Sequence, residues 1–504
     1  MAFQRPGVYV QETLNPVPNA LGPNSESIAA FIGSNDRGPT TPTLITSWSQ
    51  YTNLFGTWND VTVSGVTNDL PLAVYMFFAN GGSRAYVCRA TGTGAAQATR
   101  NFTDRAGTPL NTLNIKAANA GVWGNNLNIT IEDSLVTGYI NVTVYYGGNT
   151  DPYIVEKYTD VTMVSTDARY LVSVINAQSQ YIVVTDLNSA SAGSTKNPST
   201  VSNQSLTTGA RGSTPNGSSY STALSSFDII LQSLVLNLAG QTSASIVNLA
   251  ISYAQARGDI FVVIDGADDT VANELTLAAS YTASSYAAVY YPRITIPDPT
   301  LGVGGATGAT KKIGPAGAVA GLYMATDASR GVFKAPAGLN ARLAGAVAVT
   351  ALSTAELDSL NSASAAVNAI KYVPGSGIVV MGARTLKSGY VDKYVPVRRT
   401  LIYLSKSLKD LTEFAVFEPN DEILWRRINS TCNSFLTGFW SNGGLRGETP
   451  AQAFFVKCDA TTNPQLKIDN GEVNIEVGVA LQRPAEFVII KIGQFDGGST
   501  VTVA

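Results

Sequence analysis

The apolar residues near the end of the chain follow the period of an α-helix. In residues 397–414 a leucine recurs at every third or fourth position, at Leu401, Leu404, Leu408 and Leu411. This spacing predicts a helix with one apolar face.

A second helix is predicted directly after the sequence FEPND, residues 417–421. Pro419 interrupts the first pattern, Asn420 is a suitable N-cap, and Asp421 begins a negatively charged first turn. The run Asn-Gly-Gly at 442–444 predicts the end of this helix. Its expected buried stripe comprises Leu424, Ile428, Cys432, Phe435 and Phe439.

A strand is predicted at residues 473–479, where apolar and polar side chains alternate. The apolar positions are Val473, Ile475, Val477 and Val479. Together with the two helices, this strand predicts a small α/β domain over residues 387–485.

The pattern upstream changes twice. Residues 26–90 and 225–386 hold short apolar strands, such as 259–265, and helical segments, such as 243–257, which predict one α/β core built from two parts of the chain. Residues 91–224 hold strand-like runs separated by Gly, Asn, Asp and Ser, which predict an inserted β-rich domain. Its polar end, 188–221, is interpreted as a loop or an exposed tip.

The two ends of the chain differ from these domains. Residues 1–25 contain the strand-like GVYVQE and then a Pro-, Asn- and Gly-rich run, and residues 486–504 contain the strand-like FVIIKIGQ. Both ends are interpreted as extended arms. The simpler alternative for the second arm is a strand that completes its own domain's sheet.

The composition describes a weakly charged globular chain. Charged residues make up 14% of the 504 residues and the formal net charge is -3, against roughly 25% charged residues in typical soluble proteins. Low charge favours packing against copies of the same chain, although a weakly charged monomer is the alternative. No basic cluster stands out, because pairs such as Lys311-Lys312 are isolated, so we expect no nucleic acid partner.

The cysteines and the apolar segments bear on two questions, whether the chain forms disulfides and whether it inserts into a membrane. Cys88, Cys432 and Cys458 are odd in number and widely spaced, so buried reduced thiols are expected rather than disulfides. The N-terminus lacks a secretion signal, and no apolar run is long enough to span a bilayer, so we expect no direct membrane insertion.

The sequence excludes most catalytic chemistry. It contains no histidine, which removes Ser-His-Asp and Cys-His systems and HExxH zinc sites. The Gly-rich run 302–314 matches no phosphate-binding motif, so no cofactor is expected. The aromatic residues Trp425, Phe435, Phe439 and Trp440 are expected in a core rather than in a ligand cage. The chain is predicted not to be an enzyme.

Several longer motifs resemble those of contractile phage tail sheath proteins. They include FEPNDEILW (417–425), SNGGLRGETPAQAFFVKCD (441–459), RPAEFVIIKIGQ (483–494), RGDIFVVID (257–265) and RPGVYVQE (5–12). The resemblance extends over roughly three quarters of the chain and is weaker between residues 91 and 220. Sheaths of R-type bacteriocins and other contractile injection systems are related to this family.

The resemblance implies a fold of both α/β and α+β classes, with an α/β sheath core, an inserted β-rich domain that faces outward, a small α/β C-terminal domain that faces inward, and extended N- and C-terminal arms. It implies a structural subunit that forms stacked hexameric rings around a tail tube and contracts to drive the tube through a host envelope. The implied partners are copies of itself, the tail tube protein, and baseplate and tail terminator proteins. The implied location is the virion tail, assembled in the host cytoplasm.

The resemblance also implies strand exchange between subunits through both arms. The arm residues are Val8, Tyr9, Val10, Gln11, Val488, Ile489, Ile490 and Ile492, and the receiving sheet contains Val473, Ile475, Val477 and Val479.

Two other classes of protein function remain open. One is a different self-assembling surface or capsid-like structural protein, and the other is a histidine-free hydrolase that uses Asp265 and Asp268.

Overall fold

The structure is a computed structural model that describes residues 27–58, 62–63, 66–67, 69–299, 308–389 and 392–486. The described chain divides into two compact units. The larger unit contains residues up to Ser329 and the segment Pro336–Lys393, and the smaller unit contains Arg330–Ala335 and the residues from Tyr394 onward. Each unit is described by itself.

An eight-stranded sheet forms the centre of the larger unit, with the order β2-β5-β1-β13-β14-β15-β19-β20. The six inner strands are parallel, and β2 and β20 pair antiparallel at the two edges. The strands are β1 (Ile28–Gly33), β2 (Thr43–Ile45), β5 (Ala85–Arg89), β13 (Leu234–Asn237), β14 (Ile260–Asp265), β15 (Ala287–Tyr291), β19 (Val367–Val373) and β20 (Gly377–Val380).

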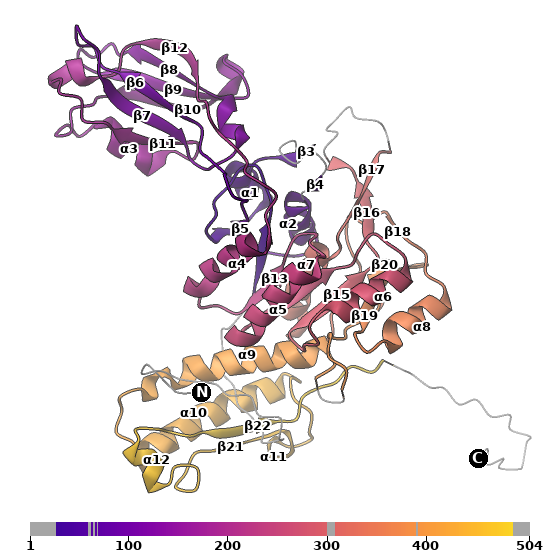
Figure 1. Cartoon of the computed structure of the whole chain (residues 1–504). Helices are drawn as coiled ribbons and strands as arrows, with labels where there is room; N and C mark the ends of the chain where they lie inside the picture. Colours follow the sequence, from indigo (N-terminus) through magenta and orange to yellow (C-terminus); the bar gives the residue numbers. More distant parts are fainter. Residues whose placement is uncertain are drawn as a thin grey trace, which may run out of the picture. The chain divides into compact units, whose positions relative to one another are not determined.

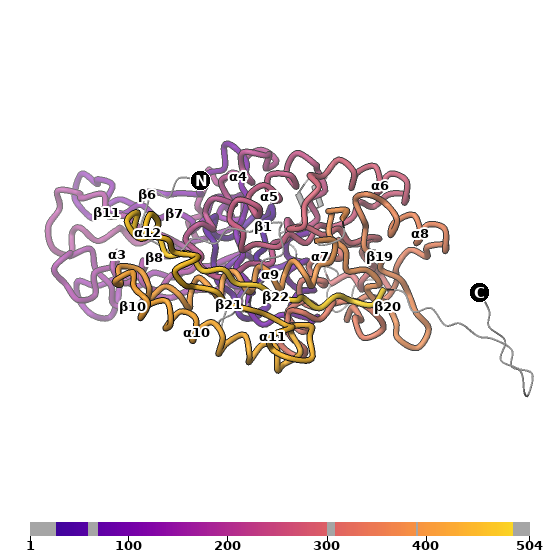
Figure 2. The backbone as a smooth tube through the Cα atoms, turned by 90° about the horizontal axis from the view of Figure 1, so that it is seen from below, coloured from indigo at the N-terminus to yellow at the C-terminus, as the bar shows by residue number. Residues whose placement is uncertain are grey.

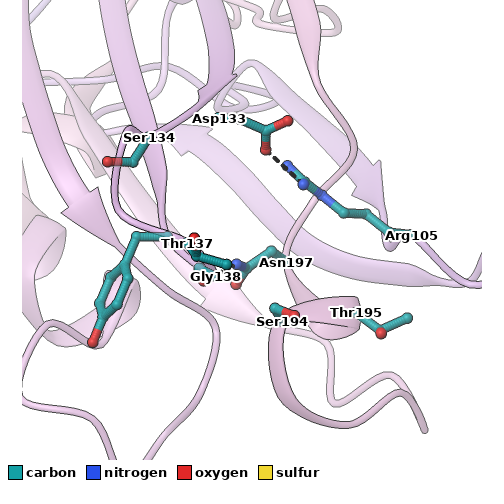
Figure 3. Close-up of a pocket in the computed structure, with 9 residues that line it drawn as sticks. Arg105, Asp133, Ser134, Thr137, Gly138, Ser194, Thr195 and Asn197 are labelled. Atoms are coloured by element: carbon teal, nitrogen blue, oxygen red, sulfur yellow. Dashed lines mark hydrogen bonds and ion pairs between the residues drawn. The ribbon is translucent and has the colours of Figure 1, made fainter.

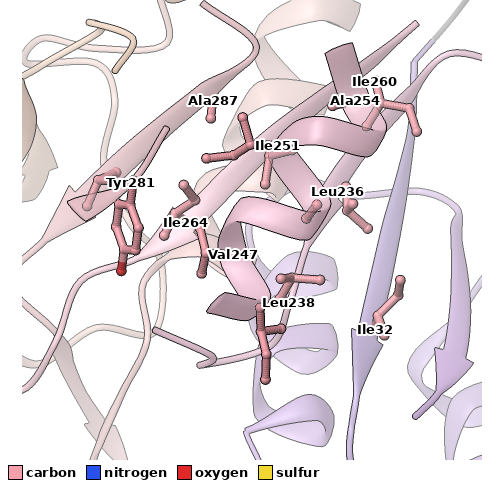
Figure 4. Close-up of a cluster of buried hydrophobic side chains, with 14 of the residues drawn as sticks. Ile32, Leu236, Leu238, Val247, Ile251, Ala254, Ile260, Ile264, Tyr281 and Ala287 are labelled. Carbon is pink, nitrogen blue, oxygen red and sulfur yellow. The ribbon is translucent and has the colours of Figure 1, made fainter. Parts of the chain in front are cut away.

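Helices cover both faces of this sheet because successive side chains of its buried strands point to opposite faces. On one face Ile32 and Ile264 belong to a cluster that includes Val247 and other residues of the covering helices (Figure 4). On the other face the ring of Phe31 packs against a helix residue, Phe77, at a centroid distance of 5.4 Å. The helices are α1 (Trp48–Phe55), α2 (Leu70–Ala79), α4 (Gly217–Ser225), α5 (Ala244–Arg257), α6 (Val271–Ser280), α7 (Ala316–Arg330) and α8 (Thr354–Ser362). The predicted mixed α/β class is confirmed.

The inserted segment forms two antiparallel sheets with a core of their own. One sheet has the order β10-β9-β8-β12 and the other β11-β7-β6 (Figure 1). The elements are β6 (Thr99–Thr103), β7 (Asn111–Ala117), β8 (Leu127–Asp133), β9 (Ile140–Tyr146), β10 (Ile154–Val161), α3 (Leu171–Gln178), β11 (Ile182–Asp186) and β12 (Val201–Ser205). A separate apolar cluster, from Ala98 to Leu206, lies within this segment.

The interpretation of residues 188–221 as a polar loop or tip is wrong in part. Strand β12 lies in the middle of this segment and pairs with β8. Near its end, helix α4 begins at Gly217, and Tyr220 of that helix belongs to the apolar cluster on the large sheet. The composition did not reveal these elements because neither carries an alternating or heptad-like apolar pattern.

Two small sheets complete the larger unit. Strand β16 (Ile294–Pro297) lies between β17 (Thr310–Ile313) and β18 (Ala348–Val349), and β3 (Thr62–Val63) pairs with β4 (Val66–Thr67). Lys311 and Lys312 belong to β17. The described part of the Gly-rich run therefore contains a strand, and only Gly314 and Pro315 separate this strand from α7 (Ala316–Arg330). Glycines before a helix are typical of a phosphate-binding loop, but here a Lys-containing strand occupies the place of that loop.

Among its described residues, the smaller unit contains two long α-helices, two short α-helices and a two-stranded sheet. Figures 1 and 2 show these elements. The elements are α9 (Val395–Thr412), α10 (Glu422–Ser441), α11 (Pro450–Ala453), β21 (Phe454–Lys457), α12 (Gln465–Asp469) and β22 (Glu476–Val479). One apolar cluster joins them, and it includes Leu404 and Leu408 of α9 and Ile428 and Cys432 of α10.

Both predicted helices are present, with differences in detail. The N-cap of α10 is Asp421 rather than Asn420, because the Asp421 carboxylate accepts hydrogen bonds from the backbone N–H groups of the first turn. Ile428 and Cys432 of the predicted stripe are fully buried, and so is Leu436, which the prediction did not include, whereas Phe435 is only partly buried. Asn442 is the C-cap, as the Asn-Gly-Gly run predicted.

Candidate assembly site

The two-stranded sheet of the smaller unit is the candidate site for assembly. Strands β21 and β22 pair antiparallel, with Phe454 opposite Val479 and Val456 opposite Val477. Within the described residues, no third strand joins this sheet. Each strand therefore has an outer edge whose backbone N–H and C=O groups are available to a further strand.

The sheet has one buried face and one exposed face. Phe454 and Val477 are buried in the cluster with α10, and Val456 packs against that cluster. Phe455, on the opposite face, is 42% exposed. A two-stranded sheet is marginally stable alone, so the apolar side chains of α10 that join the same cluster hold it in place.

The predicted receiving residues all lie against the same core, although the strand is shorter than predicted. Val477 and Val479 are in β22, whereas Val473 and Ile475 precede it and pack against the cluster as partly buried side chains. The strand begins late because the segment before it is held by a side chain. Asn463 accepts from the backbone N–H of Asn474 and donates to its carbonyl oxygen.

The FEPND motif fastens the loop before α10 to the segment before β22. Asn420 Oδ1 accepts a hydrogen bond from Trp425 Nε1 at 2.9 Å, and Asn420 Nδ2 donates to the carbonyl oxygen of Glu472 at 2.9 Å. This double role was not predicted, since the bond to Glu472 joins residues that are distant in the sequence. The motif thereby links the helix pair to the strand.

The end of the described chain is anchored at the start of α9. The hydroxyl of Tyr394 donates a hydrogen bond to the Glu486 carboxylate at 3.0 Å. Upstream, Arg446 N donates to Ala480 O at 2.8 Å, and Leu445 forms a bridge with Leu481. These contacts hold the last described residues in place.

The predicted arm residues, Val8 to Gln11 and Val488 to Ile492, lie outside the described residues.

The cysteines are buried and reduced, as predicted. Burial raises the pKa of Cys432 to about 12 and the pKa of Cys458 to about 11, and both lie in the core of the smaller unit. Burial likewise raises the pKa of Cys88 to about 11 in the larger unit. Deprotonation is required for nucleophilic chemistry, so these thiols serve as packing groups.

The carboxylates Asp265 and Asp268 do not form a catalytic pair. Asp265 is buried at the end of β14 and accepts hydrogen bonds from Asn237, Gly240 N and Ala316 N. Asp268 is exposed and paired with Lys312. The first carboxylate therefore holds the ends of neighbouring elements together, and the second forms a surface ion pair.

A cavity of about 300 Å³ lies at one end of the inserted domain (Figure 3). Its charged side chains are Arg105 and Asp133, which face each other at 2.6 Å, and hydroxyl and amide groups such as those of Ser134 and Asn197 complete its lining. The lining contains one carboxylate, and that carboxylate is already paired.

The described residues contain no cluster of acidic or cysteine side chains that could hold a metal ion. Among these residues no helix is both long and apolar enough to cross a membrane.

Known proteins resemble the chain in sequence over part of its length and in fold over nearly all of it. Residues 392–495 match the family model of the phage tail sheath C-terminal domain. No curated protein matches the chain.

Three solved structures illustrate the similarity in fold. The sheath of an extracellular contractile injection system (PVC) in the contracted state is 23% identical, with a TM-score of 0.58 and coverage of 98% of both chains. The contracted helical sheath of the anti-feeding prophage is 21% identical, with a TM-score of 0.57 and coverage of 98% of this chain and 100% of that chain. A sheath tail protein from Listeria innocua is 14% identical, with a TM-score of 0.62 and coverage of 92% and 96%.

These comparisons confirm the resemblance to contractile tail sheath proteins. The chain has the mixed α/β multidomain fold of sheath structures along almost its whole length. Its C-terminal residues, which contain the FEPND motif and the β21–β22 sheet, also carry the sequence pattern of the sheath C-terminal domain. The candidate assembly site lies within the matched segment.

Proposed function

We propose that this chain is the structural subunit of a contractile tail sheath, which forms stacked hexameric rings around a tail tube and shortens to drive the tube through a host envelope. The observation that carries the proposal is the sheath C-terminal domain pattern at residues 392–495 on a chain with the sheath fold. Copies of the chain, the tube protein, and baseplate and tail terminator proteins are the proposed partners. The proposed location is the virion tail, after assembly in the host cytoplasm.

A contracting lattice must keep its subunits connected while they slide and rotate. We propose that the outer edges of β21 and β22 receive arm strands from neighbouring subunits, which would satisfy this requirement. The arms are those of the sequence analysis, residues 1–25 and 486–504. The two-stranded sheet, with its open edges and one apolar face against α10, supports this role.

The energy of strand addition is finely balanced. Hydrogen bonds contribute roughly 0.5–1.5 kcal/mol each, whereas ordering a residue costs about 1–2 kcal/mol. Burial of Val8, Val10, Ile490 and Ile492 therefore decides whether an arm binds, and the arms should order on assembly. Hydrogen exchange on the unassembled full chain measures this directly. Protected amides at Val8 to Gln11 before assembly would contradict it.

We further propose the domain roles that the sequence suggested. The core, 26–90 with 225–386, forms the body of the subunit, residues 387–485 face the tube, and residues 91–224 face outward. The separate apolar cluster of the inserted domain supports its role as an added module rather than part of the assembly framework.

The other function classes receive less support. A hydrolase would need an available carboxylate pair, and Asp265 and Asp268 are each engaged elsewhere. Other self-assembling proteins share low charge, but the sheath pattern at 392–495 favours the contractile class.

Negative-stain electron microscopy of the purified chain tests the proposed function. Hollow striated tubes or short cylinders are expected. The double variant Val8→Asp with Val10→Asp should remain unassembled, because a charged arm cannot bury its apolar face. The matched control Gln4→Asp carries a charge outside the proposed strand and should assemble. Wild-type protein that never polymerises would refute the proposed function. Tubes formed equally well by the double variant would refute the strand-exchange mechanism.

A further inference from the structure

A buried arginine of the core lies against three aromatic rings of the inserted domain. The guanidinium carbon of Arg37 is 4.0 Å from the ring centre of Tyr181, 4.8 Å from that of Trp123 and 5.8 Å from that of Tyr146. All three distances are within the range of cation–π attraction, which is strongest where water is excluded. Arg37 is only 2% exposed.

The three rings belong to separate segments of the inserted domain. Trp123 lies in a short 3-10 turn, Val122–Asn126, Tyr146 ends β9, and Tyr181 directly precedes β11. Their ring centres are 5.9 to 6.4 Å apart. They form one aromatic socket, which we define as Trp123, Tyr146 and Tyr181.

The loop that presents Arg37 is itself fixed to the core. Arg37 donates a hydrogen bond to Asn53 O at 2.7 Å, and Asn35 donates to Phe55 O at 2.7 Å, so both residues hold the loop on α1. Gly38 follows with φ 117°, and a Cβ there would lie 2.2 Å from the ring of Phe55. The guanidinium is therefore held in place before it meets the socket.

Further contacts surround the same joint. Arg211, on the returning linker, lies 3.0 Å from the Asp36 carboxylate, and Arg89 donates to Asp36 O at 2.8 Å. Gly121 approaches so closely that a Cβ on it would lie 2.2 Å from Asp36 O. The two linkers also pair with each other at Ala96 and Ala210. The joint thus combines a socket, an ion pair and a paired linker.

We propose that Arg37 and the aromatic socket lock the inserted domain onto the core, so that the two parts move as one body. The inserted domain has its own core, and the other contacts described above at the joint are made by its two linkers and by Asp36. Arg37 is a positioning residue in this proposal. The inference does not depend on the sheath function, since the joint lies wholly within one chain.

Hydrogen exchange on the unassembled full chain with the substitution Arg37→Ala tests the lock. Amides of residues 119–126 should exchange about tenfold faster than in the wild type, whereas amides of residues 140–143, at the end of β9 away from the socket, and of β14 should keep their wild-type rates. The control Lys157→Ala removes an exposed positive charge from β10 and should change none of these rates. Low millimolar guanidinium ion should restore slow exchange to the Arg37→Ala variant by filling the socket.

Two results would overturn the proposal. One is a wild-type exchange rate at 119–126 in the variant. The other is faster exchange of equal size at residues 140–143 and in β14, which would make Arg37 a general stability residue. If the Arg37→Ala protein is insoluble, Tyr181→Leu provides the same comparison from the other side of the joint. Unchanged exchange at 119–126 in that variant also refutes the lock.

Discussion

The indole Nε1 of Trp425 donates a hydrogen bond to Oδ1 of Asn420 over 2.9 Å, and this bond ties the first turn of α10 to the loop that precedes it. Trp425 is 7% exposed. Because the other end of the Asn420 amide donates to Glu472 O, one side chain connects the helix to the segment that leads into β22.

Asn420→Ala should therefore lower the free energy of unfolding of the smaller unit by about 1–3 kcal/mol, the usual effect of leaving a buried polar group unpaired. Asn420→Asp is the matched control, since it keeps an acceptor for Trp425 and loses only the bond to Glu472. Denaturant unfolding followed by tryptophan fluorescence compares them. Equal destabilisation by both variants would show that the Trp425 bond contributes nothing.

The sequence could predict the smaller unit well because its signals are local. Helical spacing located α9 and α10, and the Asn-Gly-Gly run located the end of α10 at Asn442. The N-cap was misplaced by one residue, since Asn and Asp are almost equally good caps and only the tertiary bond to Glu472 distinguishes their roles. Strand β21 was missed because its four residues are too few to show an alternating pattern.

Other features could not be predicted because they depend on contacts between distant parts of the chain. Arg37 and Tyr181 are 144 positions apart by their numbers in the chain, and no spacing rule joins them. The hydrogen bonds of Asp265 likewise come from two distant segments, namely the end of β13 with the turn after it (Asn237 and Gly240) and the start of α7 (Ala316), whereas the sequence showed only Asp265, Asp268 and Asp269 close together at the end of a strand.

Glu274 should make the stability of the larger unit depend on pH. Its side chain is fully buried, Oε2 accepts from Ala267 N, and Oε1 has no hydrogen-bond partner among the described residues. Burial raises the pKa of Glu274 to about 7, although Ala267 N and the charge of Arg293 lower it and Asp269 raises it. The folded state therefore favours the protonated form of Glu274. The contribution of this group to the free energy of unfolding is fully present below pH 4.5 and is lost as the pH rises through about 7.

Glu274→Gln should raise the melting temperature at pH 8 and leave it unchanged at pH 4.5. The gain in free energy is at most about 3 kcal/mol, from the linkage between pKa and stability, and less if the new amide lacks a partner. Glu356→Gln is the contrasting control, because hydrogen bonds with Ser353 lower the pKa of Glu356 and so favour its charged form in the folded state. Loss of this carboxylate should therefore destabilise the protein at pH 8. A lower melting temperature for Glu274→Gln at pH 8 would contradict the argument.

The buried thiols should resist modification in the folded protein. Burial raises the pKa of each of the three cysteines to about 11 or about 12, so almost no thiolate is present at pH 8. A thiol-reactive chromophore should label all three cysteines promptly in denaturant and none at that rate in buffer. Rapid labelling of one thiol in buffer would reveal local opening around it, and Ala substitution of each cysteine in turn would identify which.

Removal of the inserted domain should leave the core folded and able to assemble. The apolar cluster of the insert, from Ala98 to Leu206, is separate from the cluster on the large sheet, and Ala96 and Ala210 lie side by side as a bridge pair. A short Gly-Ser turn in place of residues 97–209 can therefore join the two linkers. The deletion should carry Arg37→Ser as well, since the socket that covers this guanidinium is removed with the insert.

Negative-stain microscopy of the deletion variant should then show tubes that are narrower than those of the intact chain. Circular dichroism of the same protein separates the possible failures: a folded core that forms no tubes would refute the outward placement of the insert, whereas an unfolded core would refute its independence as a module.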